Sequence, residues 1–92
     1  NKYNIVSLIG AMTYCNNHSL LFNNVHFFLK KLGYFIFTQR TDLWIKYQFD
    51  IFLVRYSKKF KIIYKSRPLD YLPKNKEFQK NIKIHLVLLQ KR

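Results

Sequence analysis

The sequence predicts an α+β fold in which two helices pack on one face of a small antiparallel sheet. The chain has 49% hydrophobic and 18% aromatic residues, far more than a disordered basic segment contains. Apolar residues in its first third recur at helical spacing, whereas those after Gly33 form short aromatic and β-branched runs. With 92 residues there is room for one small core, which is only marginally stable by itself.

The first helix is expected over residues 4–15. Asn4 is placed to accept a hydrogen bond from a first-turn amide as the N-cap. The apolar residues that follow share one helical face: Ile5, Leu8, Ile9, Met12 and Cys15. Free amides at a helix start also suit a phosphate, so Asn4 is a candidate RNA contact. An ordinary solvated cap explains Asn4 equally well.

The second helix is expected to follow the polar residues 16–19 and to end at Gly33. Its apolar stripe consists of Leu21, Val25, Phe28, Leu29 and Leu32. Gly33 suits the left-handed position that often terminates a helix. Lys30 and Lys31 then fall in the last turn, where cations favour the negative end of the helix dipole, and both can face solvent.

Short antiparallel strands are expected next, at residues 34–38, 43–47, 51–56 and 60–65. Pro68 and Pro73 then mark an irregular connection that continues to Asn81. A final strand over residues 82–89 alternates at first and becomes apolar on both faces, so something must cover its second face. We therefore expect an N-terminal α+β domain, residues 1–68, and a remnant of a C-terminal lobe, residues 69–92, that is truncated or completed by a partner.

The net charge limits the classes of partner that this protein can have. Seventeen Lys and Arg residues against four Asp and Glu give a net charge of +13, and a polyanionic partner would offset the resulting self-repulsion. The longest apolar stretches are too short to cross a bilayer. The single cysteine, Cys15, cannot form an internal disulfide, and no signal peptide is recognisable, so secretion is not expected. Nucleic acid, and RNA in particular, is the expected partner.

The predicted RNA-binding residues are mainly cations. The densest run interleaves Lys58, Lys59, Lys61, Lys65 and Arg67 with aromatic and aliphatic residues, so that one strand parity can face phosphate. Lys30, Lys31, Arg55 and Ser66 complete the set together with Asn4. A solvated surface is the alternative reading of such a run, but so few acidic residues balance it that RNA binding is preferred.

Other site classes find less support. Tyr and Phe side chains could stack on unpaired bases, yet Phe28, Phe35, Phe37 and Phe52 sit at periodic positions that favour core packing. Cys15, His18 and His26 lack a nearby fourth zinc ligand. The scattered acidic residues and the absence of a nucleophile motif or glycine-rich loop argue against an enzyme. We expect no cofactor, no metal and no small-molecule substrate.

The rival class is attachment to a membrane surface through the basic face. Cationic amphipathic segments bind anionic lipids, but residues 4–15 contain no Lys or Arg. We therefore expect no membrane partner.

The order of two helices followed by antiparallel strands resembles the N-terminal half of small-subunit ribosomal protein eight, the universal family written uS-eight. The resemblance spans roughly residues 4–68. Its motifs are Ile5, Ile9 and Met12 on the first helix, Ser19 and Leu32-Gly33-Tyr34 around the second, and the alternating residues 51–56 followed by Lys65-Ser66-Arg67-Pro68. Leu69 stands where the family has Gly, and the family's C-terminal Thr-Ser-Lys-Gly motif has no counterpart.

This resemblance implies a structural constituent of the small ribosomal subunit that binds and stabilises its ribosomal RNA beside neighbouring ribosomal proteins. Residue types with A/T-rich codons (Phe, Tyr, Met, Ile, Asn and Lys) make up about half of the chain, which favours an organellar gene. We therefore expect a mitochondrially encoded subunit of the mitochondrial ribosome, in the matrix, that acts in translation. The alternative is a protein-binding subunit of another organellar complex, completed by strand addition from a neighbour.

Overall fold

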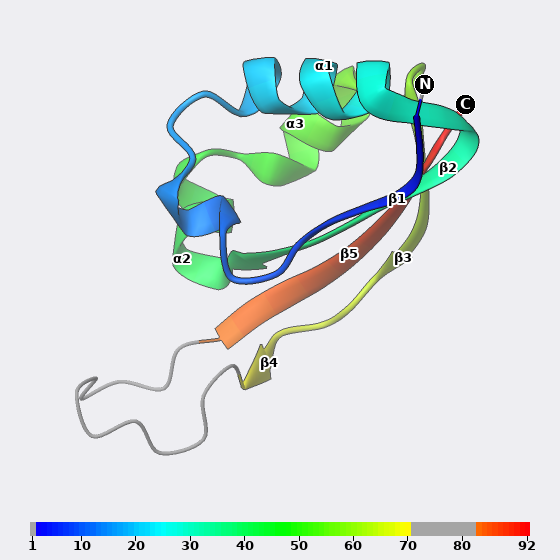
Figure 1. Ribbon diagram of the computed structural model, residues 1–92. Helices are drawn as coiled ribbons and strands as arrows, with labels where there is room; N and C mark the ends of the chain where they lie inside the picture. The colour runs from blue at the N-terminus through cyan, green and yellow to red at the C-terminus, as the bar shows by residue number, and fades with distance from the viewer. Residues whose placement is uncertain (1, 71–82) are drawn as a thin grey trace.

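The computed structural model describes residues 2–70 and 83–92, and it has the α+β class that the sequence predicts. Helices cover one face of a single twisted sheet (Figure 1). Along the chain the elements are β1 (Tyr3–Leu8), the 3-10 turn η1 (Met12–Tyr14), α1 (His18–Phe28), β2 (Leu29–Arg40), α2 (Thr41–Lys46), α3 (Phe49–Arg55), β3 (Phe60–Lys65), β4 (Leu69–Asp70) and β5 (Lys83–Lys91).

The sheet is mixed, with the strand order β1-β2-β5-β3, and β4 also pairs with β5. β1 runs parallel to β2, while β2, β3 and β4 all run antiparallel to β5. β5 confirms the predicted final strand and lies in the middle of the sheet. The strand assigned to a C-terminal lobe therefore belongs to the same sheet and core as the preceding elements.

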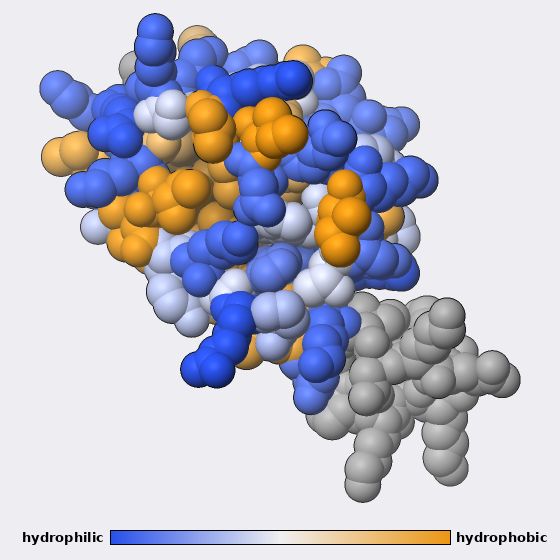
Figure 2. Space-filling model, turned by 180° about the vertical axis from the view of Figure 1, so that it is seen from behind, coloured by the Kyte–Doolittle hydropathy of each residue, from blue (hydrophilic) through white to orange (hydrophobic). Residues whose placement is uncertain are grey.

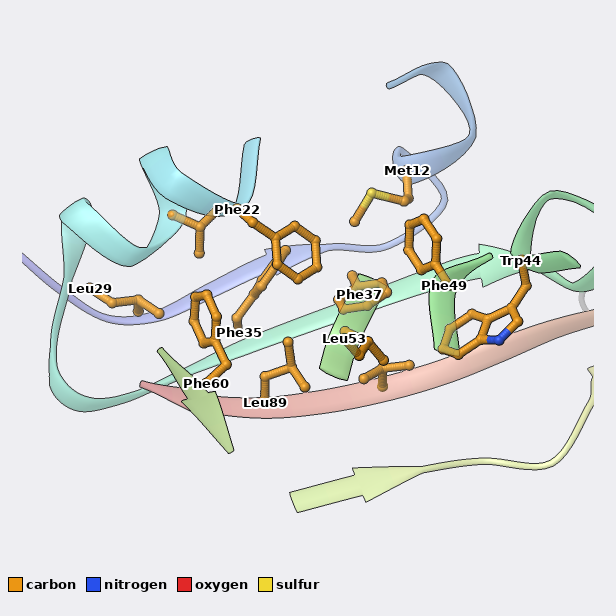
Figure 3. Close-up of a cluster of buried hydrophobic side chains, with 12 residues drawn as sticks. Met12, Phe22, Leu29, Phe35, Phe37, Trp44, Phe49, Leu53, Phe60 and Leu89 are labelled. Atoms are coloured by element: carbon orange, nitrogen blue, oxygen red, sulfur yellow. The ribbon is translucent and has the colours of Figure 1, made fainter. Parts of the chain in front are cut away.

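The core lies between the sheet and the helices (Figure 3). Phe22 of α1 is fully buried, and its ring centroid lies 5.3 Å from that of Phe35 and 5.7 Å from that of Phe37 on β2. Val87 and Leu89, alternate residues of β5, are also fully buried in this core. Edge-on aromatic pairs such as these add to the stabilisation from buried area.

The prediction of a helix over residues 4–15 is wrong, because residues 3–8 form β1 and are followed by η1. Val6 and Leu8 alternate along β1 and pack against the core. A run this short fits period 2 and period 3.6 equally, and pairing with β2 decides between them. Asn4 is consequently an exposed strand residue and caps no helix. Asn17 is the N-cap of α1, because its Oδ1 accepts a hydrogen bond from the Leu20 N–H at 3.0 Å.

The second predicted helix is confirmed in position, but α1 ends at Phe28 and not at Gly33. Lys30 and Lys31 therefore lie outside the helix, in an irregularity of β2 opposite Asn4. Leu32 has the left-handed conformation, with φ 64°, that was expected of Gly33. Gly33 is required for space, because an added Cβ would lie 2.8 Å from the Lys30 carbonyl oxygen and 3.0 Å from the Asn4 carbonyl oxygen.

Strands 34–38 and 60–65 are confirmed within β2 and β3, but those predicted at 43–47 and 51–56 are helices α2 and α3. Their buried residues explain the error. Phe49 and Leu53 are buried and Phe52 and Tyr56 pack beside them, a spacing of three and four that places one helical stripe on the core. Of the irregular connection predicted after Pro68, Leu69 and Asp70 form β4, and residues 71–82 lie outside the described residues.

Candidate nucleic-acid interface

Eight exposed cations gather at one end of the molecule, where both termini, the end of α1 and the connection from α3 to β3 meet (Figure 1). Backbone hydrogen bonds join these segments: Arg92 N–H donates to Lys59 O at 2.9 Å, and Lys2 N–H to Phe28 O at 2.9 Å. Gln90 Nε2 also donates to Leu32 O at 3.2 Å. We call this surface the basic end: Lys2, Lys30, Lys31, Arg55, Lys58, Lys59, Lys61 and Arg92.

None of the three acidic residues in the described part of the chain lies at the basic end. Asp42 and Asp50 are in the first turns of α2 and α3, and Asp70 is in β4. From behind, Figure 2 shows hydrophilic side chains over most of the surface, with separate hydrophobic spots between them. A cluster of one sign without counter-charges raises the local potential and attracts polyanions.

Neutral groups hold two of these cations in place. Lys59 Nζ donates to Asn23 Oδ1 at 3.1 Å, and Arg92 Nε donates to Ser57 O at 2.6 Å. Beneath them the partly buried Lys91 Nζ donates to His26 O at 2.7 Å and to Leu29 O at 2.8 Å. The neutral partners of Lys59 and Arg92 order these two side chains without cancelling their charge, which suits a phosphate contact.

The titration of His26 reports the same positive potential. Its pKa is lowered from 6.5 first by burial and then by the charges of Lys91 and Lys59. The imidazole therefore stays neutral where a further positive charge would be repelled.

The structure brings together six of the ten predicted RNA-binding residues: Lys30, Lys31, Arg55, Lys58, Lys59 and Lys61. Lys2 and Arg92 also belong to this surface, and sequence reasoning did not single them out. Backbone pairing places Arg92 beside Lys59 and Lys2 beside Phe28, residues far from them in the sequence, so no local pattern signals either cation.

The other four predicted residues are not among the cations of the basic end. Lys65 turns toward the helices, where its Nζ is 3.1 Å from Asp50 Oδ1 and 4.9 Å from the ring centroid of Trp44. Its hydrogen bond lowers the pKa of Asp50 below the usual value. Ser66 is 3% exposed, and its Oγ accepts a hydrogen bond from the Leu86 N–H at 2.8 Å, which commits it to the sheet. Arg67 is exposed beyond the end of β3. Asn4 is exposed in β1 opposite Lys30 and Lys31, so it lies beside the basic end but adds no charge to it.

A second surface borders the basic end on the sheet face that the helices leave uncovered (Figure 1). Because Val87 and Leu89 point into the core, Leu88 and Gln90 point away from it. Residues paired across strands share a face, so Tyr34 and Lys61 flank Gln90, and Ile36 and Tyr64 flank Leu88. We call these six residues the open sheet face: Tyr34, Ile36, Lys61, Tyr64, Leu88 and Gln90.

The described residues offer neither a metal site nor a membrane-spanning helix. No three His, Cys, Asp or Glu side chains of residues 2–70 and 83–92 are grouped as metal ligands. Over the same residues, no helix is long and apolar enough to span a bilayer.

No family model, curated protein or solved structure matches this chain. The element order, with a strand first and two short helices between β2 and β3, also differs from the helix-helix-strand order on which the ribosomal resemblance rests. The charge and geometry of the basic end are therefore the main indications of function.

Proposed function

We propose that this protein binds RNA through the basic end as a structural, non-catalytic subunit of a ribonucleoprotein. The main observation behind this proposal is that eight exposed cations, from four separate parts of the chain, lie on a surface where the described residues supply no Asp or Glu side chain. Lys and Arg side chains neutralise phosphates and release bound counterions, which supplies most of the affinity of such complexes. These contacts position an RNA without reading its sequence.

The specific assembly that we propose is the mitochondrial small ribosomal subunit, with its ribosomal RNA and neighbouring ribosomal proteins as partners. Net charge and codon-related composition support this assignment. The fold suits a scaffold role, because strand pairing and aromatic packing fix the distances between the cations of the basic end.

The alternative is a protein-binding subunit that accepts an added strand. β5 is paired on both sides within the chain, so an added strand would join at an outer edge of the sheet. The edge at β3 carries Lys61 and Lys65 and an irregularity between Ile62 and Tyr64, features that oppose strand addition. The outer edge of β1 is the remaining place for such a partner.

The test is sedimentation of the native protein from purified mitochondria through a high-salt sucrose gradient, followed by mass spectrometry. We expect it to migrate with the small ribosomal subunit and to form RNA crosslinks at residues 58–61. Migration in a light or membrane fraction would contradict the proposal.

Charge variants test which surface is responsible. A basic-end triple variant, Lys58→Gln, Lys59→Gln and Lys61→Gln, should leave the ribosomal fraction at lower salt than the unaltered protein. The matched control carries Lys46→Gln, Arg67→Gln and Lys83→Gln, which remove the same charge from exposed positions away from the basic end. Equal effects of the two triple variants would show that the basic end is not the binding surface.

A further inference from the structure

We propose that the open sheet face stacks unpaired RNA bases on Tyr34 and Tyr64, while the basic end holds the flanking phosphates. This inference rests on the proposed RNA binding and names the class of RNA: single-stranded, with its bases splayed apart. Aromatic side chains on an open sheet can stack on the bases of any sequence.

Both tyrosines are exposed, and neither ring pairs with another aromatic ring of residues 2–70 and 83–92. Tyr34 is 38% exposed and Tyr64 is 53% exposed. The aromatic pairs around Phe22 and Phe49 lie on the opposite face of the sheet, in the core. An exposed aromatic ring on a paired strand is presented rigidly and loses little entropy when a base stacks on it.

The distance between the two tyrosines suits an RNA strand whose bases are not stacked on one another. Tyr34 is paired with Gln90 and Tyr64 with Leu88, so the rings stand on opposite sides of β5 and two residues apart along it. Strand spacing and rise place their Cα atoms about 12 Å apart. Bases stacked in a helix lie about 3.4 Å apart. One RNA can therefore occupy both rings only if its bases are unstacked, which a duplex does not allow.

The surroundings of the tyrosines complete a nucleotide site. Lys61 lies in the row of Tyr34 and Gln90, and it belongs to both the open sheet face and the basic end. Ile36 and Leu88 form an apolar floor between the rings. The face holds no acidic residue, so its charge matches a polyanion and does not match an ordinary acidic peptide surface.

The experiment compares two RNA probes on the full chain by fluorescence anisotropy. One is an unstructured single strand of about 12 nucleotides, within the usual site size of stacking surfaces, and the other is a blunt duplex of the same length. The double variant Tyr34→Leu and Tyr64→Leu should bind the single strand at least about tenfold more weakly. Its affinity for the duplex should stay unchanged, because the phosphate contacts remain.

Two controls keep the result interpretable. The double variant Tyr34→Phe and Tyr64→Phe retains both rings and should keep the single-strand affinity. Tyr14→Leu alters a tyrosine that is 87% exposed in η1, outside the open sheet face, and should have no effect. Thermal unfolding of each variant verifies the fold. Ultraviolet irradiation of the complex should crosslink the single strand to Tyr34 and Tyr64.

The inference fails if the folded leucine variant keeps its single-strand affinity, or if it loses affinity for both probes equally. In either case the proposed function survives, because Lys58→Gln and Lys59→Gln, the two changes of the basic-end triple variant that lie outside the open sheet face, test it separately. If that triple variant binds both probes as tightly as the unaltered protein does, RNA binding at the basic end is itself contradicted.

Discussion

Leu32 and its neighbour Gly33 are constrained in different ways: Leu32 has a positive φ, and Gly33 has no room for a Cβ. Gly33 is buried between the Lys30 and Asn4 carbonyl oxygens, where a Cβ would clash with backbone. We expect Gly33→Ala to lower the free energy of unfolding by about 1–3 kcal/mol, because the irregularity of β2 must shift to admit the methyl group. Urea unfolding at equilibrium measures this change.

Leu32→Gly is the matched control for that prediction. Leu32 holds φ 64° with an exposed side chain, so glycine removes strain there without opening a cavity. We expect its effect to lie between zero and about 1 kcal/mol of stabilisation, since the added freedom of the unfolded chain offsets part of the gain. A Gly33→Ala protein as stable as the unaltered one would show that the irregularity adapts freely.

His18 should make the fold sensitive to mild acid. Burial lowers its pKa from 6.5, and its ring lies 4.8 Å from those of both Tyr47 and Phe49. The unfolded chain then binds the proton more tightly, so stability is retained above about pH 6.5 and is lost as the pH falls below it. His26, whose pKa is also lowered, contributes with the same sign.

We expect His18→Phe to keep the ring packing and to flatten the pH dependence of unfolding between about pH 7 and pH 5. It should also stabilise the protein, because His18 Nε2 is buried without a hydrogen-bond partner. Urea titrations across this range provide the measurement, with His26→Gln as the comparison. If the pH dependence of unfolding were unchanged in His18→Phe, His18 would not be the group that makes the fold sensitive to acid.

At the scale of elements, Lys91 ties the last strand to the end of α1. Its Nζ donates to the His26 and Leu29 carbonyl oxygens, where a cation also favours the negative end of the helix dipole. We expect Lys91→Met to cost about 1–3 kcal/mol, the usual value for hydrogen bonds from a charged group. Lys83→Met, at the exposed opposite end of β5, should cost less.

Thermal and urea unfolding at about 1 M salt would isolate this effect, because the Debye length of about 3 Å then screens the general repulsion between cations. Equal costs for Lys91→Met and Lys83→Met would show that the link between β5 and α1 adds nothing to stability.

Elements were predictable where one pattern dominates. Residues 60–65 and 82–89 have clear strand character in the sequence; residues 60–65 form β3, and residues 83–89 form most of β5. The errors at residues 43–47 and 51–56 came from aromatic and β-branched content, which was weighted above the three-and-four spacing of Phe49, Phe52, Leu53 and Tyr56. The parallel pairing of β1 with β2 could not be foreseen, because it depends on partners about 29 residues apart in sequence.

At the scale of the whole molecule, the sequence predicts that Lys and Arg side chains bind RNA, but it only partly predicts which of them lie on the same surface. Lys58, Lys59 and Lys61 are recognisable as a local run. Lys65 belongs to the same run, yet a bulge in β3 and the carboxylate of Asp50 turn it toward the helices. Arg92 joins the surface only because β5 runs back along β3.

The concentration of cations at one end predicts opposite salt responses for folding and for RNA binding. Without RNA, the cations of the basic end repel one another. Added salt screens this repulsion and should therefore raise the free energy of unfolding. With RNA, each phosphate contact releases counterions, so added salt should weaken binding. If roughly six cations engage phosphates, the logarithm of the affinity should fall against the logarithm of salt with a slope of about −4 to −5.

The basic-end triple variant should change both responses together. Each lost cation should reduce the steepness of the binding slope by about one, and the fold without RNA should become more stable as repulsion falls. The control at Lys46, Arg67 and Lys83 removes equal charge from separated positions, so it should leave the binding slope nearly unchanged. Anisotropy titrations and urea unfolding over the same salt range measure the two effects. A triple variant that binds RNA less steeply with salt but gains no stability would mean that the basic end does not strain the free protein, and that its charge is already screened before RNA arrives.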